Sequence, residues 1–183
     1  MLYMAECGFT DPAQEEAWNE WYGGRRLDEL LSVPGFLTSQ RFKAVTPVAS
    51  PYVAIHTIDG PGVFTSKAYK AMSGGGFQGW QRYIGNWKRN LFTGLGIAPG
   101  VAMEEFLAMT DGLPEETQRL GIRFTWLQNA GLDGSVPQRG IARLDAAQAR
   151  ALGPLSRFPL AIYAPLSPRK RSGVADAATH RVP

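Results

Sequence analysis

The beginning of the chain has a pattern of apolar positions that predicts a strand followed by one long amphipathic helix. Residues 2–9 alternate side chains between two faces, as an extended strand does. From Asp11 to Leu31, apolar side chains recur at helical spacing. Asp11 is suited to cap the first turn, and Pro12 fits the first helical position. The Val-Pro-Gly-Phe sequence at 33–36 then ends the helix.

Gly23-Gly24 interrupts this helical pattern. Each glycine inside a helix costs about 1 kcal/mol relative to alanine. The pattern therefore favours a kink or a loose turn at this point. The alternative interpretation is functional, because two missing side chains leave room above a pocket.

Two further strands are predicted at 36–45 and 52–59, and the turn-rich connection between them favours a hairpin. A shorter helix is expected at 62–72, followed by a flexible break at 73–76. Apolar side chains at i, i+3, i+4 and i+7 then predict another helix, with Trp80, Tyr83, Ile84 and Trp87 on one face.

A fourth strand is predicted at 101–109, which gives the element order β-α-β-β-α-β. This order is typical of the split-βαβ or ferredoxin-like arrangement, an α+β fold with an antiparallel sheet and helices on one face. We expect this domain to span residues 1–110. A second, reduced β-β-α-β half sharing the core is expected at 117–166, and a tail at 167–183. The predicted elements of the second half are strands at 120–129, 140–144 and 158–165 and a helix at 146–152.

Amino-acid composition limits the class of protein, but it does not indicate which reaction the protein would catalyse. The 183 residues are 44% hydrophobic and 19% charged, which is ordinary for a globular protein. A net charge of +3 gives little support for nucleic-acid binding. The single cysteine, Cys7, excludes an intrachain disulfide and zinc knuckles, and no apolar run approaches the ~20 residues that cross a bilayer. We expect a cytoplasmic protein without a nucleic-acid partner, a membrane span, a bound metal or a cofactor.

The stretch from Glu20 to Phe36, followed by Arg41-Phe42 on the next strand, resembles the dimeric α/β-barrel superfamily. That superfamily includes muconolactone-isomerase-like, EthD-like and antibiotic-biosynthesis-monooxygenase-like proteins. The resemblance covers roughly residues 1–109. It implies a four-stranded sheet with helices on one face and a second sheet that closes a barrel over the other. The second sheet normally comes from another subunit, so a homodimer is expected, although residues 117–166 could supply part of it in the same chain.

Arg26 stands where relatives of this type often have a histidine, in the pattern W-Y-x-x-x-H-L. A histidine can carry protons near neutral pH, whereas an arginine stays charged. Arg26 is therefore a candidate to hold a carboxylate or an enolate. The alternative, which the sequence favours, is an ion pair with Asp28, Glu29 or a partner subunit.

His56 is the candidate proton carrier. Strand alternation places it on the same face as Tyr52, opposite Val53 and Ile55. We expect the Val/Ile face to pack under the helices and the Tyr/His face to point into the barrel, where the resemblance implies a ligand cavity. A neutral imidazole there could act as a general base. The alternative is a hydrogen-bonded structural histidine.

An unusually dense aromatic group supplies the candidate pocket wall. Core packing accounts for most of these rings, since aromatic side chains dominate burial energies. A minority are expected to line an apolar pocket for a flat ligand. The candidate substrate-binding residues are Trp21, Tyr22, Tyr52, Trp80 and Tyr83.

These features predict a small-molecule-binding α/β-barrel protein. The first hypothesis is a cofactor-independent enzyme of isomerase, lyase or monooxygenase-like type, acting on an aromatic or lactone-like metabolite, with His56 and Arg26 as catalytic residues. The second hypothesis is a ligand-binding or assembly protein without chemistry. The sequence does not decide between them.

Overall fold

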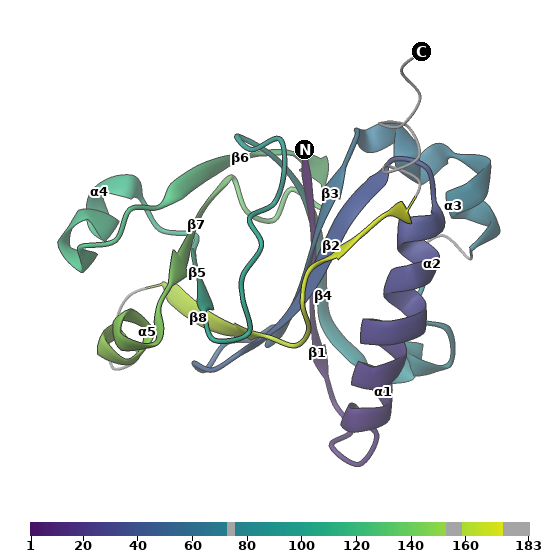
Figure 1. Ribbon diagram of the computed structural model, residues 1–183, viewed down its shortest axis with the longest axis horizontal. Helices are drawn as coiled ribbons and strands as arrows, with labels where there is room; N and C mark the ends of the chain where they lie inside the picture. The colour runs from purple at the N-terminus through teal and green to yellow at the C-terminus, as the bar shows by residue number, and fades with distance from the viewer. Residues whose placement is uncertain (73–75, 153–158, 174–183) are drawn as a thin grey trace.

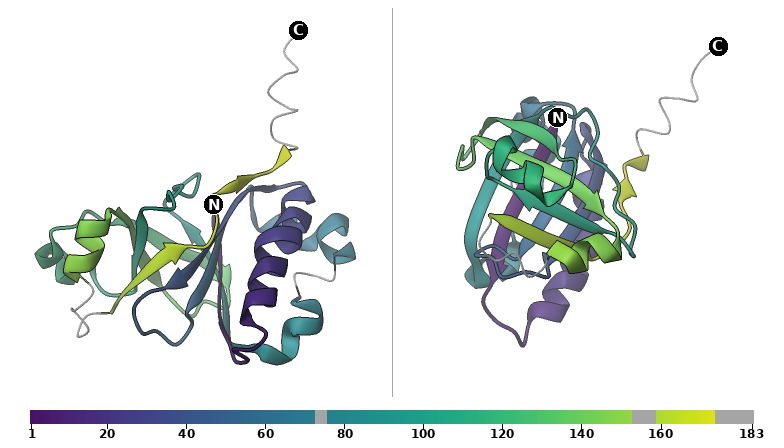
Figure 2. Two further views of the ribbon diagram at one scale, coloured as in Figure 1. Left: turned by 60° about the horizontal axis from the view of Figure 1, so that its bottom comes forward. Right: turned by 90° about the vertical axis from the view of Figure 1, so that its left-hand side faces the viewer.

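The strands of this protein form one antiparallel sheet that closes on itself as an eight-stranded barrel. The computed structural model describes residues 1–72, 76–152 and 159–173. Around the barrel the strand order is β3-β1-β4-β6-β7-β5-β8-β2, and the β2–β3 pairing closes the ring. Figures 1 and 2 show the barrel with a layer of helices against one side. The fold class is α+β, as the sequence predicts.

The first half of the chain supplies four neighbouring strands in the order β4-β1-β3-β2. Its helices lie on the outer face of these strands (Figure 1). The strands are β1 (Leu2–Phe9), β2 (Phe36–Ala44), β3 (Tyr52–Ile58) and β4 (Ile84–Thr93). The helices are α1 (Glu15–Trp21), a π-helical turn (Tyr22–Arg26), α2 (Leu27–Ser32) and α3 (Lys67–Ala71), with 3-10 turns at Pro61–Thr65 and Gln78–Tyr83.

The second half completes the barrel within the same chain. Its strands join the first half at both edges, through the β4–β6 and β2–β8 pairings. The elements are β5 (Phe106–Thr110), β6 (Thr125–Leu132), β7 (Gln138–Leu144) and β8 (Leu160–Pro165), with helices α4 (Pro114–Thr117) and α5 (Ala146–Leu152) and a 3-10 turn at Gln118–Leu120. A second subunit is therefore not needed to close this sheet.

Strands β1 and β3 are buried on both faces, because helices cover one side and the barrel lumen lies on the other. On β1, Leu2 and Met4 belong to the lumen cluster, whereas Tyr3 and Ala5 belong to the cluster under the helices. The lumen is filled by apolar side chains from both halves, among them Phe42, Val53, Ile55, Phe92, Leu107, Leu127 and Ile141. The barrel is thus a packed core over most of its length.

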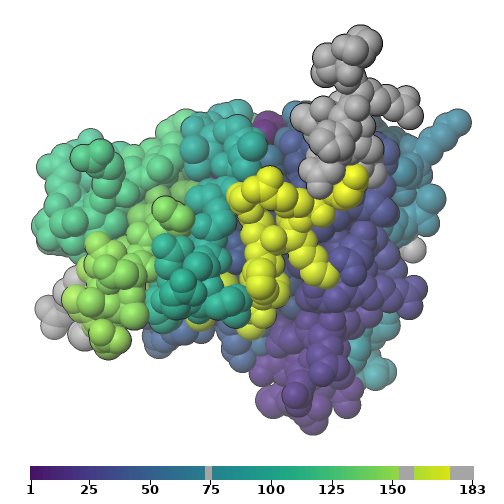
Figure 3. Space-filling view, in the orientation of Figure 1, coloured from purple at the N-terminus to yellow at the C-terminus, as the bar shows by residue number. Residues whose placement is uncertain are grey.

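Part of the predicted tail is structured. Strand β9 (Lys170–Arg171) pairs with β2 at Thr38 and Ser39. Ser172 donates a hydrogen bond from its hydroxyl to the carbonyl of Leu31 at 2.8 Å, which ties the segment to α2. Figure 3 shows the yellow C-terminal residues lying across the surface between the purple and green halves. The rest of the predicted tail, 174–183, lies outside the described residues, as do residues 73–75 of the predicted break.

The predicted fourth strand and the helix before it are wrong. The fourth strand of the first half is β4 at 84–93, and of the predicted 101–109 only 106–109 lie in a strand, β5. That strand, β5, pairs with β7 and β8 in the second half. The segment 84–93 becomes a strand because β1 pairs along most of it and β6 pairs with residues 90–93, and this pairing overrides its helix-like spacing.

The helix start is also displaced from its prediction. The N-cap residue is Gln14, and the Asp11 carboxylate instead accepts a hydrogen bond from the Ala13 N–H at 3.0 Å in the preceding turn. The helical path continues through Gly23-Gly24 as a π-helical turn rather than breaking. Such turns are rare and occur often at functional sites.

We predict that Gly94→Ala destabilises the barrel where β4 meets β6. Gly94 has φ +109°, and a Cβ there would lie 2.7 Å from the carbonyl oxygen of Trp126. Positive φ and a backbone clash together should lower the free energy of unfolding by about 2 kcal/mol or more. Urea denaturation measures the change. Gly96→Ala is the matched control, because nothing lies within 4 Å of its Cβ, and it should change stability by less than about 0.5 kcal/mol. Equal effects of the two substitutions would contradict the prediction.

Candidate functional site

Two arginine side chains are buried in the layer between the helices and the first-half sheet, where apolar packing alone needs no charged group. Arg26 and Arg41 are each only 2% exposed in this layer, which also holds His56 and three buried tyrosines, Tyr3, Tyr22 and Tyr69. Buried arginines are usually paired with carboxylates, because an uncompensated charge is costly to remove from water. We call this group of side chains the helix-layer site.

Arg41 extends from β2 into an aromatic box. Its guanidinium carbon lies 4.1 Å from the ring centre of Tyr22 and 4.7 Å from that of Trp18, which are cation–π distances. The guanidinium also donates to the side-chain oxygen of Asn19 at 2.9 Å and to the Asn19 carbonyl at 3.2 Å. Among the described residues no carboxylate forms an ion pair with Arg41. Burial lowers the pKa of Arg41 to about 10, so the group is still a cation at neutral pH.

Arg26 sits in the π-helical turn and has only part of its hydrogen bonding satisfied. Its Nη1 lies 3.3 Å from the Glu29 carboxylate, so the ion pair favoured by the sequence is present. Glu29 makes a shorter contact of 2.8 Å with the exposed Arg25. The Nη2 of Arg26 is buried without a hydrogen-bond partner in the described part of the chain.

His56 is held on β3 by close polar and aromatic contacts. Its Nδ1 lies 2.6 Å from the Ser39 hydroxyl oxygen, and its ring stacks on Tyr3 with 5.1 Å between ring centres. Burial, followed by the charges of Arg26 and Arg41, lowers the pKa of His56 to about 3. The imidazole is therefore neutral at physiological pH.

The predicted orientation of β3 is wrong. Val53 and Ile55 belong to the lumen cluster, whereas Tyr52 belongs to the cluster under the helices. His56 shares the Tyr52 face, contacts Tyr3 and Phe36 of that cluster, and so points toward the helices rather than into the barrel. Alternation identifies which residues share a face, but both faces of this strand are buried, so composition did not reveal which one meets the lumen.

The phenol groups of the helix-layer site remain protonated. Burial raises the pKa of Tyr22 to about 12 and that of Tyr3 well above its ordinary value. Burial also raises the pKa of Tyr69, while the charges of Arg89 and Arg26 act in the opposite direction. The three hydroxyls can therefore donate as well as accept hydrogen bonds.

The other predicted pocket residues divide into two places. Trp21, Trp80 and Tyr83 are partly exposed and form a chain of rings at the edge of the helical layer, with ring centres 6.4 and 6.5 Å apart. Tyr52 lies deeper, edge-on to Trp18, and its hydroxyl donates to the Glu15 carboxylate. The structure brings Tyr22 and Tyr52 together around Arg41. Tyr22 also contacts the outer ring group, with 5.8 Å between its ring centre and that of Trp21.

Three residues of the site were missed by the sequence analysis as functional candidates: Trp18, Asn19 and Arg41. Arg41 entered only as part of a family resemblance. The sequence signal that could have identified Arg41 is its position next to the apolar Phe42 within a predicted strand. The Nε1 of Trp18 is buried without a hydrogen-bond partner among the described residues, which no sequence pattern reveals.

Other chemistry has little support in the described residues. Cys7 is buried, and burial raises the pKa of its thiol to about 12, so a thiolate nucleophile is disfavoured. No group of three or more His, Cys, Asp or Glu side chains in ranges 1–72, 76–152 and 159–173 is arranged to hold a metal ion. Within the same ranges, no helix has both the length and the apolar character needed to span a membrane.

Comparison with known proteins identifies the fold but not a close relative. No family model and no curated protein matches the chain. Among solved structures, an anthrone oxidase-like protein aligns over 94% of this chain and 93% of its own, with a TM-score of 0.51 and 10% identity. This is the dimeric α/β-barrel fold.

Two further solved structures align with this α/β-barrel chain. A candidate chlorite dismutase covers 91% of this chain and 95% of its own, with a TM-score of 0.47 and 12% identity. A candidate monooxygenase from Lactobacillus acidophilus NCFM covers 94% and 96%, with a TM-score of 0.49 and 6% identity. The α/β-barrel fold implied by the resemblance at residues 20–42 is confirmed by the alignment with the anthrone oxidase-like protein. At these identities the similarity establishes the fold alone.

We predict that His56 makes the α/β barrel sensitive to acid. Its folded-state pKa of about 3 lies below the ordinary value of 6.5, so the unfolded chain binds an extra proton between these pH values. His56 should therefore cost up to about 1.4 kcal/mol of stability per pH unit as pH falls from 6.5 toward 3. Denaturant unfolding of the wild type and His56→Gln at several pH values tests this. The variant should have the flatter profile, and parallel profiles would refute the prediction.

Proposed function

We propose that this chain binds a small molecule with an aromatic or apolar body and an anionic oxygen at the helix-layer site. The carrying observation is a set of three buried N–H groups without hydrogen-bond partners among the described residues: Trp18 Nε1, Arg26 Nη2 and Arg89 Nε. Arg89 shares its face of β4 with Leu91, which belongs to the cluster under the helices. A buried donor without a partner costs about 1–3 kcal/mol, so such groups favour a site that a ligand completes.

The charge balance supports an anionic ligand. Arg41 has no carboxylate partner among the described residues, and Arg26 shares Glu29 with Arg25. A carboxylate or enolate oxygen near these guanidinium groups would offset buried positive charge and accept a hydrogen bond from the Nη2 of Arg26, which has no partner among the described residues. On this proposal the first half acts as a ferredoxin-like unit whose helix-covered face carries the site.

The rings at the edge of the layer give the site an apolar side. Trp21, Trp80 and Tyr83 are partly exposed and in contact with the same core cluster or with its rings. A flat ligand would reach the buried arginines past these rings and stack against them. The tyrosine hydroxyls and the neutral His56 imidazole then act as hydrogen-bonding groups toward the polar end of the ligand.

Two functional classes follow from this site. In the enzymatic class, a cofactor-independent isomerase, lyase or monooxygenase-like reaction, His56 takes a proton from carbon and Arg26 stabilises the enolate. A bound anion would raise the pKa of His56 by offsetting the two arginine charges that lower it. In the binding class there is no proton transfer, and the pKa of about 3 with the Ser39 contact favours this class for the free protein.

We predict that Arg26→Met and Arg41→Met each weaken binding of aromatic carboxylates such as 2-naphthoate by about tenfold or more, because a charge-assisted hydrogen bond is lost. Isothermal titration calorimetry measures the affinity, and 2-naphthamide is the neutral comparison ligand. Folding stability of Arg26→Met should change little or rise, because an apolar side chain replaces a poorly paired buried cation.

Arg25→Met is the matched control for these variants. Arg25 is the exposed neighbour, with 71% of its side chain accessible, and it contacts the same Glu29. It should leave the affinity within about twofold of wild type. Equal affinities for the carboxylate and the amide, or an equal loss in Arg25→Met, would argue against the anion site.

Proton exchange separates the two functional classes. If the chain is an enzyme of the proposed kind, it should exchange the α-proton of an enolisable aromatic ketone such as 2-tetralone for deuterium in heavy water. Proton NMR measures the rate, and His56→Gln should abolish the enhancement while Arg25→Met retains it. Saturable carboxylate binding without any exchange would support the binding class.

A further inference from the structure

A cavity of about 250 Å³ lies at one end of the barrel, away from the helix-layer site. It is lined by Glu6 of β1, Lys88 of β4, Arg139 of β7 and Tyr163 of β8, together with Asp111 directly after β5. The β2–β3 connection contributes residues 47–50 to its wall. Most of the lumen is apolar, so these charges are concentrated where the packed core ends. We call this space the barrel-end cavity.

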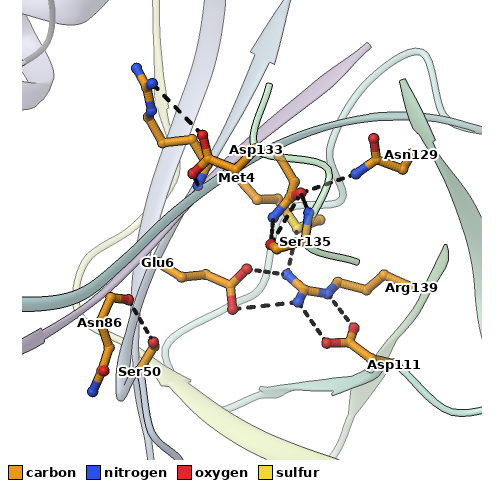
Figure 4. A network of polar contacts seen from close by, with 11 residues as sticks. Met4, Glu6, Ser50, Asn86, Asp111, Asn129, Asp133, Ser135 and Arg139 are labelled. Atoms are coloured by element: carbon orange, nitrogen blue, oxygen red, sulfur yellow. Dashed lines mark hydrogen bonds and ion pairs between the residues drawn. The ribbon is translucent and has the colours of Figure 1, made fainter. Parts of the chain in front are cut away.

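Arg139 is the buried centre of the polar network in Figure 4. Its Nη1 donates to Glu6 at 2.6 Å, while its Nε and Nη2 donate to Asp111 at 2.7 and 2.9 Å. The side chain of Arg139 is 2% exposed and that of Glu6 is 8% exposed. Because both edges of the guanidinium already bind carboxylates, Arg139 has little capacity left to bind an anionic ligand.

The groups that retain bonding capacity in the cavity are of both signs. Two carboxylates share one guanidinium, and the Asp111 side chain is 43% exposed, so its oxygens can accept a further donor. Lys88 is directly opposite Glu6 in the β1–β4 register and is exposed. It forms no ion pair with a carboxylate among the described residues. The cavity therefore has carboxylate acceptors inside, from Glu6 and Asp111, and the ammonium of Lys88 at its rim.

The remaining wall is mostly apolar, with the hydroxyl side chains of Ser50 and Thr110 among its lining residues. Val48 lies on the loop side of the cavity, and Met109 and Leu160 lie on the side of the second-half strands. The Tyr163 hydroxyl stays protonated, because burial and then the charge of Glu6 raise its pKa. A ligand here meets a hydrogen-bonding phenol, a charged floor and a wall suited to a hydrocarbon group.

We propose that the barrel-end cavity binds a small zwitterionic molecule of the amino-acid class. Its ammonium group donates to Glu6 and Asp111, its carboxylate pairs with Lys88, and its side chain lies on the apolar wall. The site uses the lumen face of the sheet, so it is independent of the proposed function at the helix layer.

Two matched sets of probes test this proposal. In each set the amino acid is compared with the compound that lacks its carboxylate and the compound that lacks its ammonium. The sets are leucine, 3-methylbutylamine and 4-methylpentanoate, and phenylalanine, phenethylamine and 3-phenylpropanoate. Affinities are measured by calorimetry or ligand-observed NMR on the full chain. At least one amino acid should bind more tightly than its amine by about two- to fivefold, for one exposed charge pair, and more tightly than its acid by about tenfold or more.

Variants assign each end of the ligand. Lys88→Met should reduce the amino acid to the affinity of its amine and leave the amine unchanged. Asp111→Asn should weaken both the amino acid and the amine. Lys67→Met, on the exposed start of α3, is the matched control and should have no effect.

The proposal fails if neither amino acid shows saturable binding, if the acids bind as well as the amino acids, or if Lys88→Met has no effect on a bound amino acid. Asp111→Asn could disturb Arg139, so its unfolding free energy is measured beside its affinity. Weakened amine binding in a variant of unchanged stability supports direct contact. Loss of binding only in step with loss of stability contradicts it.

Discussion

The rest of the structure depends on the burial of strands β1 and β3 on both faces. Strand β1 lies in the middle of this sheet, hydrogen-bonded to β3 on one side and β4 on the other. Its even-numbered side chains from Leu2 to Glu6 fill the lumen, and the odd-numbered ones from Tyr3 pack under the helices. Because the strand period is two residues, a shift of one residue would exchange the two sets. The register of β1 therefore fixes both candidate sites at once.

Much of the fold could be predicted from the sequence because its local patterns agree with its tertiary contacts. The hairpin β2–β3 and the helix α5 form where spacing and turn residues indicate them. The segment 84–93 has no such agreement. Its aromatic spacing fits a helix face, and only the flanking strands make it extended. Strand pairing between distant segments is the information that a single local pattern lacks.

The candidate site was less predictable than the fold for a related reason. His56 could be paired with Tyr52 by alternation, but the side of the sheet could not be assigned, since apolar residues occupy both faces. Arg41 is a charged residue that an isolated strand pattern assigns to the surface. Only the docking of α1 onto β2 shows that Trp18 and Tyr22 enclose it. The site forms only where α1, the π-helical turn and β2 meet, and the sequence of any one of these elements does not predict it.

The helix-layer site and the Arg139 network at the barrel end differ in how completely their buried charges are paired, and that difference implies different roles. Arg139 at the barrel end binds two carboxylates, so the ion pairs themselves hold β1 and β7 together with the start of the β5 connection. Arg26 and Arg41 of the helix layer have fewer carboxylate partners, and the Nη2 of Arg26 has no hydrogen-bond partner among the described residues. A cluster built only for stability would be expected to resemble the first, since unpaired buried donors are costly. The incomplete pairing under the helices therefore supports the proposed ligand site there, whereas the barrel-end ion pairs join strands and leave only their remaining bonding capacity for the ligand proposed at the barrel end.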